Sequence, residues 1–309
     1  MATLSAPLPL RAPSAPARVL SLLWRDKAAF VAVLFLLAVL FCVVFGPSLL
    51  GEAAAQIQLT ARNSRPFDMT HGRLFFLGGD AVGRPILARI VVGARNTVVV
   101  AAAATLLSMT VGIALGLIAG YRSGRIGNLI LRTADVVMSF PSLLLALIVL
   151  YVLEPALTNV VLVIAITRVP IWIRTSRAEV LEIRERAYVT AARTMGSHPL
   201  AIVLRHVLPA ITPTIATLST LEFAMVMLAE STLSFLGLGI QPPAFSWGLM
   251  VAQGQNYLAT AWWLAFWPGL AITLTACAMN VVANWLRLVT DPLQRWRLDS
   301  NPTPTKNNA

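Results

Sequence analysis

Two acidic residues, Glu222 and Glu230, lie in the otherwise apolar run of residues 211–233. A charged side chain at the centre of a membrane-crossing helix costs about 2.5 to 3.5 kcal/mol, so each acid needs a partner, a water-filled path or a proton. Because the two residues are a little more than two helical turns apart, their side chains lie near one face of a helix. Two interpretations follow: this face lines a water-filled path that attracts a cationic group, or the acids make polar contacts between packed helices.

The sequence holds no pattern for catalysis or nucleotide hydrolysis. A P-loop needs GxxxxGK[ST], because its backbone N–H groups cradle phosphates and its Lys reaches the terminal ones. The only lysines, Lys27 and Lys306, stand in no such pattern, and neither HExxH nor GxSxG occurs. Cys42 and Cys277 lie in apolar runs without metal-ligand spacing. The histidines, far apart in the sequence, are His71, His198 and His206. We therefore expect no enzymatic activity, no bound cofactor and no metal.

The composition is that of an integral membrane protein. Hydrophobic residues make up 57% of the chain and charged residues 12%, whereas an ordinary soluble domain carries about 25% charged residues. A helix needs about 20 mostly apolar residues to cross a membrane. The candidate spans are residues 28–45, 97–120, 134–153, 160–173, 211–233 and 262–286, of which the fourth carries Arg168 and Pro170. We predict an all-α, polytopic membrane protein with about six transmembrane helices.

The distribution of basic residues predicts the orientation of these spans. A net charge of +11 suggests nucleic acid as the partner of a soluble protein, but in a membrane protein Lys and Arg accumulate on the cytoplasmic side. With the amino terminus inside, 18 of the 24 basic residues lie in inside segments or at the flanking helix ends. The other six are Arg62, Arg65, Arg73, Arg84, Arg89 and Arg95. We expect both termini to be cytoplasmic, membrane lipid as the surroundings, and no nucleic-acid partner.

Four parts follow from this topology. We predict a disordered cytoplasmic tail at 1–27, a first transmembrane helix with an external segment at 28–96, a transmembrane core at 97–292, and a cytoplasmic tail at 293–309. The core includes a cytoplasmic loop at 178–210. The first apolar run is longer than the roughly 7 to 15 residues of a signal-peptide core, so we expect an uncleaved span; a cleaved signal is the alternative.

A polar, arginine-bearing island at residues 188–209 separates two apolar runs. A stripe of residues spaced by three or four positions predicts a helix that leads into the island. Its members are Val180, Ile183, Ala187, Ala191 and Met195. Gly196 is expected to end this helix, Ser197 to cap a second one, and Pro199 to occupy its first turn. The sequence predicts a helix, a glycine kink and a short helix.

This island resembles the EAA loop of ABC-importer permeases, which docks on an ATPase in that family. Ala191, Ala192, Gly196, Leu208 and Pro209 match its spacing. Two residues depart from the pattern: Thr190 replaces the usual Glu, and His206 replaces Ile. The candidate coupling residues that the resemblance implies are Tyr188, Thr190, Ala191, Ala192, Gly196, His206, Leu208 and Pro209. A basic loop that only joins two spans is the alternative.

Two external segments resemble signatures of the peptide and nickel permeases in the same family. Residues 77–98 are similar to GTD-x-x-GRD-x-L-x-R-x-x-x-GAR, with Gly79 and Pro85 in place of the usual Thr and Asp. Residues 234–248 are similar to LSFLGLG-x-QPP-x-x-SWG. The signature residues are Asp80, Gly83, Arg84, Gly93, Arg95, Gly237, Gly239, Pro242, Trp247 and Gly248.

Physical arguments add expectations for these segments and for the third span. The arginines at 84, 89 and 95 with the apolar residues between them predict an amphipathic helix at the membrane interface, its apolar side toward lipid or protein; it is either an anchor or a part of the substrate passage. Glycines and prolines keep residues 234–248 out of the lipid, and Trp247, Trp262, Trp263 and Trp267 suit an interfacial belt. In the third span, Arg132 and Asp135 are three residues apart and able to pair. Pro141 is expected to kink this span.

The resemblance covers residues 77–292 and implies a DppC/OppC-type permease of the type I ABC-importer fold in a bacterial inner membrane. It implies import of dipeptides or oligopeptides, with a nickel or other small substrate as the alternative within the family. Its implied partners are ATPase subunits that bind ATP and Mg²⁺, a second homologous permease, and an extracytoplasmic substrate-binding protein. Two rival classes remain: a proton-coupled secondary transporter with Glu222 or Glu230 as proton carrier, and a membrane assembly factor.

Overall fold

The computed structural model describes residues 22–122, 124–153 and 156–290. The predictions for residues 1–21 and for the tail at 293–309 lie outside the described residues. In chain order the elements are α2 (Lys27–Ala55), η1 (Leu59–Ala61), η2 (Arg73–Leu77), α3 (Ile86–Tyr121), α4 (Arg125–Ser139), α5 (Ser142–Val152), α6 (Leu157–Ile183), α7 (Ala187–Thr194), α8 (Pro199–Ile202), the π-helical turn η3 (Val203–Val207), α9 (Leu208–Phe235), α10 (Trp247–Gly254), η4 (Gln255–Tyr257) and α11 (Trp263–Thr290). Helices thus dominate the described residues, which confirms the all-α class.

Five helical stretches are long and apolar enough to cross a membrane. They are α2, α3, α6, the continuous stretch Pro199–Phe235, and α11. The third predicted span is divided into α4 and α5, which are bent by 85°. Pro141 stands at this break and has no N–H group for a continuous helix. The predicted kink is therefore confirmed, and counting the bent pair as one span gives the six that the sequence predicted.

The helix at the start of the second span differs from the prediction. α3 begins at Ile86 and continues without a break to Tyr121. Arg84 precedes it, while Arg89 and Arg95 belong to its first turns. The helix predicted for this segment therefore forms the first turns of the second span and is not a separate element, and Ile86 on its apolar side is buried against protein.

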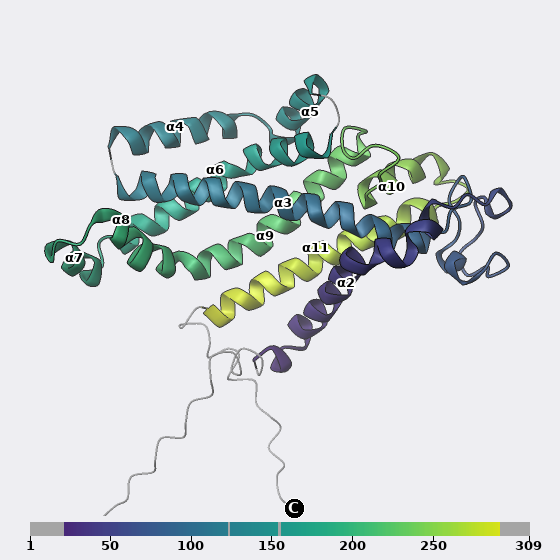
Figure 1. The fold of residues 1–309 in the computed structure, drawn as a ribbon, viewed down its shortest axis with the longest axis horizontal. Coiled ribbons are helices and arrows are strands. Elements are labelled where there is room, and N and C mark those ends of the chain that lie inside the picture. Colours follow the sequence, from purple (N-terminus) through teal and green to yellow (C-terminus); the bar gives the residue numbers. More distant parts are fainter. Residues whose placement is uncertain (1–21, 123, 154–155, 291–309) are drawn as a thin grey trace, which may run out of the picture.

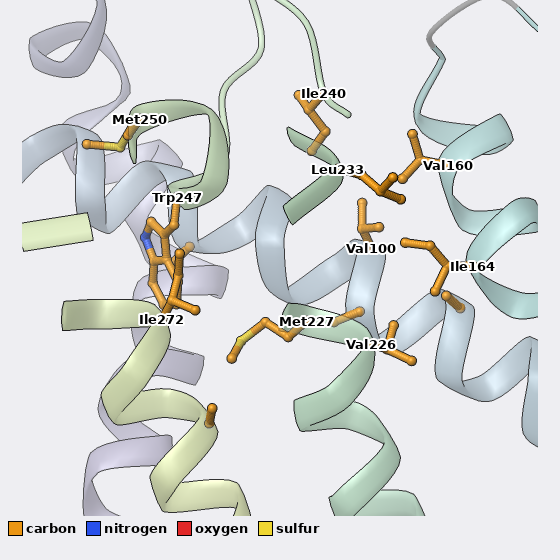
Figure 2. Packing of buried hydrophobic residues seen from close by; sticks show 14 of the residues in the cluster. Val100, Val160, Ile164, Val226, Met227, Leu233, Ile240, Trp247, Met250 and Ile272 are labelled. Carbon is orange, nitrogen blue, oxygen red and sulfur yellow. The ribbon is translucent and has the colours of Figure 1, made fainter. Parts of the chain in front are cut away.

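The long helices run between two ends of the molecule (Figure 1). We call the end that carries α7 and α8 the α7 end, and the end that carries α10 and the loops of residues 56–85 the α10 end. α2 packs on α3 and α11, and α9 packs on α11 and α3. In Figure 2, Val100 of α3, Ile164 of α6 and Val226 of α9 point toward one another. The main apolar core thus lies where three spans meet, nearer the α10 end.

Three glycines at every fourth position of α3 bring this helix close to α6. A Cβ atom added at Gly112 would lie 2.9 Å from the Val169 carbonyl oxygen, one at Gly116 would overlap the Ser176 hydroxyl, and one at Gly120 would lie 2.7 Å from the Val180 Cβ. Small residues at this spacing let the backbones of membrane helices approach each other. The contact between α3 and α6 therefore requires glycine along more than two turns.

We expect Gly116→Leu to destabilise the protein by about 1 to 3 kcal/mol or more, because the larger side chain has no space between α3 and α6. The thermal unfolding of the purified chain in detergent measures this effect. Ala114→Leu is the matched control, since Ala114 is exposed on the same helix. Equal melting temperatures for the two variants would contradict the proposed tight contact.

Candidate functional site

The polar island forms a compact module at the α7 end. α6 ends at Ile183, the chain turns over residues 184–186, and α7 starts at Ala187. The single helix predicted from Val180 to Met195 is therefore wrong. Within α7 the buried residues are Val189 and Ala192, while Met195 is 78% exposed.

Gly196 ends α7 as the sequence predicted. It has φ +80°, a left-handed conformation that glycine adopts without steric cost. The N–H of Ser197 donates to the carbonyl oxygen of Ala192 at 3.1 Å, which satisfies an end of the helix. The predicted cap is wrong by one residue, because His198 caps α8 through Nδ1, which accepts from the N–H of Leu200 at 3.3 Å. Pro199 occupies the first turn of α8 as expected.

An apolar cluster joins this module to the membrane-crossing helices. Its buried members are Val180, Ile183, Val189, Ala192, Ile202, Val207 and Ile211, from α6, α7, α8, η3 and α9. The rings of Tyr188 and His206 stack at 6.2 Å, and Leu208 packs on the cluster. Pro209 lies in the first turn of α9. A displacement of α7 therefore acts directly on α6 and α9.

The outer face of the module carries polar and apolar side chains together. Thr190, Ala191 and Arg193 of α7 are exposed. Met195, Leu200 and Leu204 expose large apolar side chains beside them. Such a mixed surface is typical of a contact site for another protein.

Glu222 has a loosely held partner in the span α6. Its Oε2 lies 3.9 Å from Nη1 of Arg168, and most of both side chains is buried. Neither Glu222 Oε2 nor Arg168 Nε has a hydrogen-bond partner within the described residues. The sequence placed Arg168 in a span but did not assign this pairing, since the contact depends on how α6 and α9 are rotated.

Glu230 lies among hydroxyl groups at the α10 end of α9. The Ser234 hydroxyl donates to its Oε1 at 2.7 Å, and the Ser231 hydroxyl lies 3.4 Å from its Oε2. Ser234 also accepts the N–H of Ile240 at 3.3 Å and lies 3.3 Å from the Ser246 hydroxyl. Glu230 is completely buried, which favours polar packing over the path-lining interpretation for this acid.

Asp80 forms the centre of a charged network at the α10 end. Its Oδ1 accepts from the backbone N–H groups of Val82 and Arg84, and its Oδ2 accepts from Nε of Arg84 at 2.7 Å. Arg89 donates to the same oxygen at 2.5 Å and to Oε1 of Gln253 at 3.2 Å. Burial alone raises the pKa of Asp80, but the hydrogen bonds and the Arg89 charge outweigh it and hold the pKa below its ordinary value.

The network connects the loop before α3 to the segment at 234–248. The Arg89 guanidinium lies 4.7 Å from the centre of the Phe245 ring. The Trp247 indole donates to the carbonyl oxygen of Ile90 at 2.8 Å, and its backbone N–H donates to Thr97 at 3.0 Å. The two family-like segments, at 77–98 and 234–248, therefore pack on each other.

Glycines of these segments serve two purposes. A Cβ atom at Gly93 would touch Phe245 and Trp247, while one at Gly239 or Gly248 would overlap α9. Gly83 and Gly237 have positive φ. Close packing and turn geometry thus account for these five signature glycines.

Three predicted contacts near the membrane surface are wrong. Trp247 and Trp263 are buried instead of belonging to an interfacial belt, whereas Trp262 is exposed. Asp135 pairs with Arg174 of α6 at 2.5 Å instead of with Arg132. Trp247 donates to Ile90 of α3, and Trp263 donates to Gly79 in the loop before α3, so segments distant in sequence supply these contacts.

A bundle of helices long enough to cross a membrane, with a helix–glycine–helix module at one end, is the architecture of a multi-pass membrane protein. Residues 112–296 match the family model described as binding-protein-dependent transport system inner membrane component. The chain belongs to this family of ABC-transporter permeases and is of the DppC type within it.

Several relatives named as transport system permease proteins match most of the chain. It is 37% identical over 269 residues to the di/tripeptide transport system permease protein DppC of Pseudomonas aeruginosa, covering 87% of this chain and 89% of the relative. It is 33% identical to the probable D,D-dipeptide transport system permease protein DdpC of Escherichia coli, over 88% of this chain and 90% of the relative. It is 36% identical to the glutathione transport system permease protein GsiD of Pectobacterium atrosepticum, over 70% of this chain and 72% of the relative.

We expect Asp80→Asn to destabilise the protein by about 3 to 5 kcal/mol, because Arg89 stays buried without its carboxylate partner. Since the pKa of Asp80 is lowered in the folded protein, its stabilisation is present at neutral pH. It is lost as the pH falls through the range below about 3.9, the ordinary aspartate value. Thermal unfolding as a function of pH measures both effects, and Glu52→Gln, at an exposed carboxylate near the end of α2, is the control. A melting temperature of Asp80→Asn equal to that of the control would refute the assignment.

Proposed function

We propose that this chain is one permease subunit of an ATP-driven importer of di- or oligopeptides. The observation that carries the proposal is the helix–glycine–helix module, packed on α6 and α9 and exposing a mixed polar and apolar face. Three relatives are named for di/tripeptide, D,D-dipeptide and glutathione transport. These names share short peptides as substrates and therefore favour peptides over nickel.

The α7 end faces the cytoplasm in this proposal. Basic side chains gather there in and beside the helix ends: Arg122, Arg125, Arg184, Arg186, Arg193, Arg205 and Arg287. Such an excess is typical of cytoplasmic segments. The α10 end then meets the extracytoplasmic substrate-binding protein, and ATP and Mg²⁺ bind to partner ATPases at the α7 end.

Energy enters through differential contact of the module with the open and closed states of the ATPases. When they close on ATP, α7 and α8 move with them, and the apolar cluster transmits the displacement to α6 and α9. A second, homologous permease supplies the other half of the path. Alternation between inward-open and outward-open arrangements of the two permeases then imports the substrate.

Uptake of a labelled dipeptide by right-side-out membrane vesicles loaded with ATP tests the function. We expect ATP-dependent uptake that requires this chain and its binding protein, and that persists when a protonophore collapses the proton gradient. Vesicles without the chain are the control. Uptake that needs the proton gradient and no ATP would establish the proton-coupled alternative instead.

The docking role of the module has its own test. We expect Gly196→Val to reduce the recovery of ATPase with the tagged chain about fivefold or more, because a β-branched residue with positive φ costs about 1 to 2 kcal/mol. Gly237→Val is the matched control, since Gly237 also has positive φ and open space around it but lies at the α10 end. Equal loss of ATPase from both variants would speak against docking through this module.

A further inference from the structure

A polar pocket lies between α6, α9 and α11 on the α7 side of Glu222. It has a volume of about 440 Å³, within the roughly 300 to 1,000 Å³ of small-molecule sites. Its polar lining consists of Thr175 and Glu179 of α6, Thr214 and Thr217 of α9, and Arg287 and Thr290 of α11. An acid and a base thus stand on different walls of one pocket.

These two charges do not neutralise each other. Within the described residues, neither Glu179 nor Arg287 takes part in an ion pair. The Thr214 hydroxyl donates to Oε1 of Glu179 at 3.0 Å and thereby fixes the carboxylate toward α9. The pocket is consequently complementary to a ligand that carries a cationic group and an anionic group at a distance from each other.

A narrower pocket adjoins the first and shares Thr175, Glu179 and Thr214 with it. Trp172 also lines this space, and its indole N–H is buried without a hydrogen-bond partner. At about 10 Å³ this narrower space holds about one water molecule and no group of a peptide.

We propose that the polar pocket binds a zwitterionic peptide of two or three residues at the cytoplasmic end of the path. Glu179 binds its ammonium group, and Arg287 binds its carboxylate. The proposal rests on the proposed peptide-import function and adds to it a release site with assigned contacts.

The position of the pocket connects release to the ATPase-docking module. Ile211 and Ile215 line the narrower pocket and also pack in the apolar cluster of the module. Thr214, which holds Glu179, lies between them on α9. A displacement of α7 and α8 therefore changes the width of the pocket, and the peptide dissociates when the module moves.

Binding of labelled alanyl-alanine to the full chain in phosphatidylglycerol nanodiscs tests the proposal. We expect Glu179→Gln and Arg287→Gln each to weaken binding about tenfold or more, because each removes one charged contact. Glu182→Gln, one turn further along α6, and Arg125→Gln, on α4, are the matched controls and should bind as the wild type does.

Modified ligands test the same contacts on the unaltered chain. N-acetyl-alanyl-alanine lacks the ammonium group, and alanyl-alanine amide lacks the carboxylate, so both should bind about tenfold more weakly or worse. These probes decide the question even if a variant fails to fold. Affinity that does not depend on Glu179 and Arg287, or no binding of alanyl-alanine at all, would overturn the proposal.

A phosphatidylethanolamine headgroup carries the same two kinds of charge and is the competing source. If that lipid binds in dependence on Glu179 and Arg287 while alanyl-alanine does not, the pocket is a lipid site and the proposal fails. Peptide uptake by vesicles distinguishes failure of the release site from failure of the peptide-import function. Normal ATP-dependent uptake without binding in the pocket removes the release site alone, whereas loss of peptide specificity in uptake removes the proposed function.

Discussion

The close contact between α3 and α6 is the constraint on which the other sites depend. Three glycines of α3 allow α6 to approach its backbone, and α6 then presents Arg168 to α9, Glu179 to the polar pocket, and Ile183 to the apolar cluster of the α7 end. Because interiors are close-packed, a bulkier residue in this contact shifts all three regions together. A purely steric feature thus positions charged groups that lie far from one another.

Buried charges are held differently at the α10 end and in the middle of the helix bundle. Asp80 accepts four hydrogen bonds from its own loop and from Arg89, while Glu222 and Arg168 approach only to 3.9 Å. Removing a partner from a well-bonded buried pair is costly, and a loose pair is already incompletely satisfied. The Asp80 network at the α10 end is therefore a fixed framework, whereas the Glu222–Arg168 pair in the middle of the bundle is able to change partners.

Hydropathy and spacing predicted the parts of the fold that depend on local sequence. The six spans, the bend at Pro141 and the turn at Gly196 follow from apolar length, a missing N–H group and a left-handed backbone. Burial of Trp247 and the pairing of Asp135 with Arg174 depend on how neighbouring helices are rotated, which one chain segment does not encode. The glycines of α3 were visible in the sequence, but their importance appears only when α6 lies against them. The polar pocket was missed for the same reason, since Glu179 and Arg287 are more than 100 residues apart.

The uninterrupted stretch from Pro199 to Phe235 joins α8, the π-helical turn and α9 in one continuous helical rod. A continuous helix transmits rotation about its axis as well as displacement along it. Side chains at its two ends therefore keep a fixed angle to each other around the axis. Each residue of an α-helix advances that angle by about 100°. The number of residues between Gly196 and Glu222 therefore sets the angular position of the Glu222 side chain around the helix axis. That position decides whether Glu222 faces Arg168.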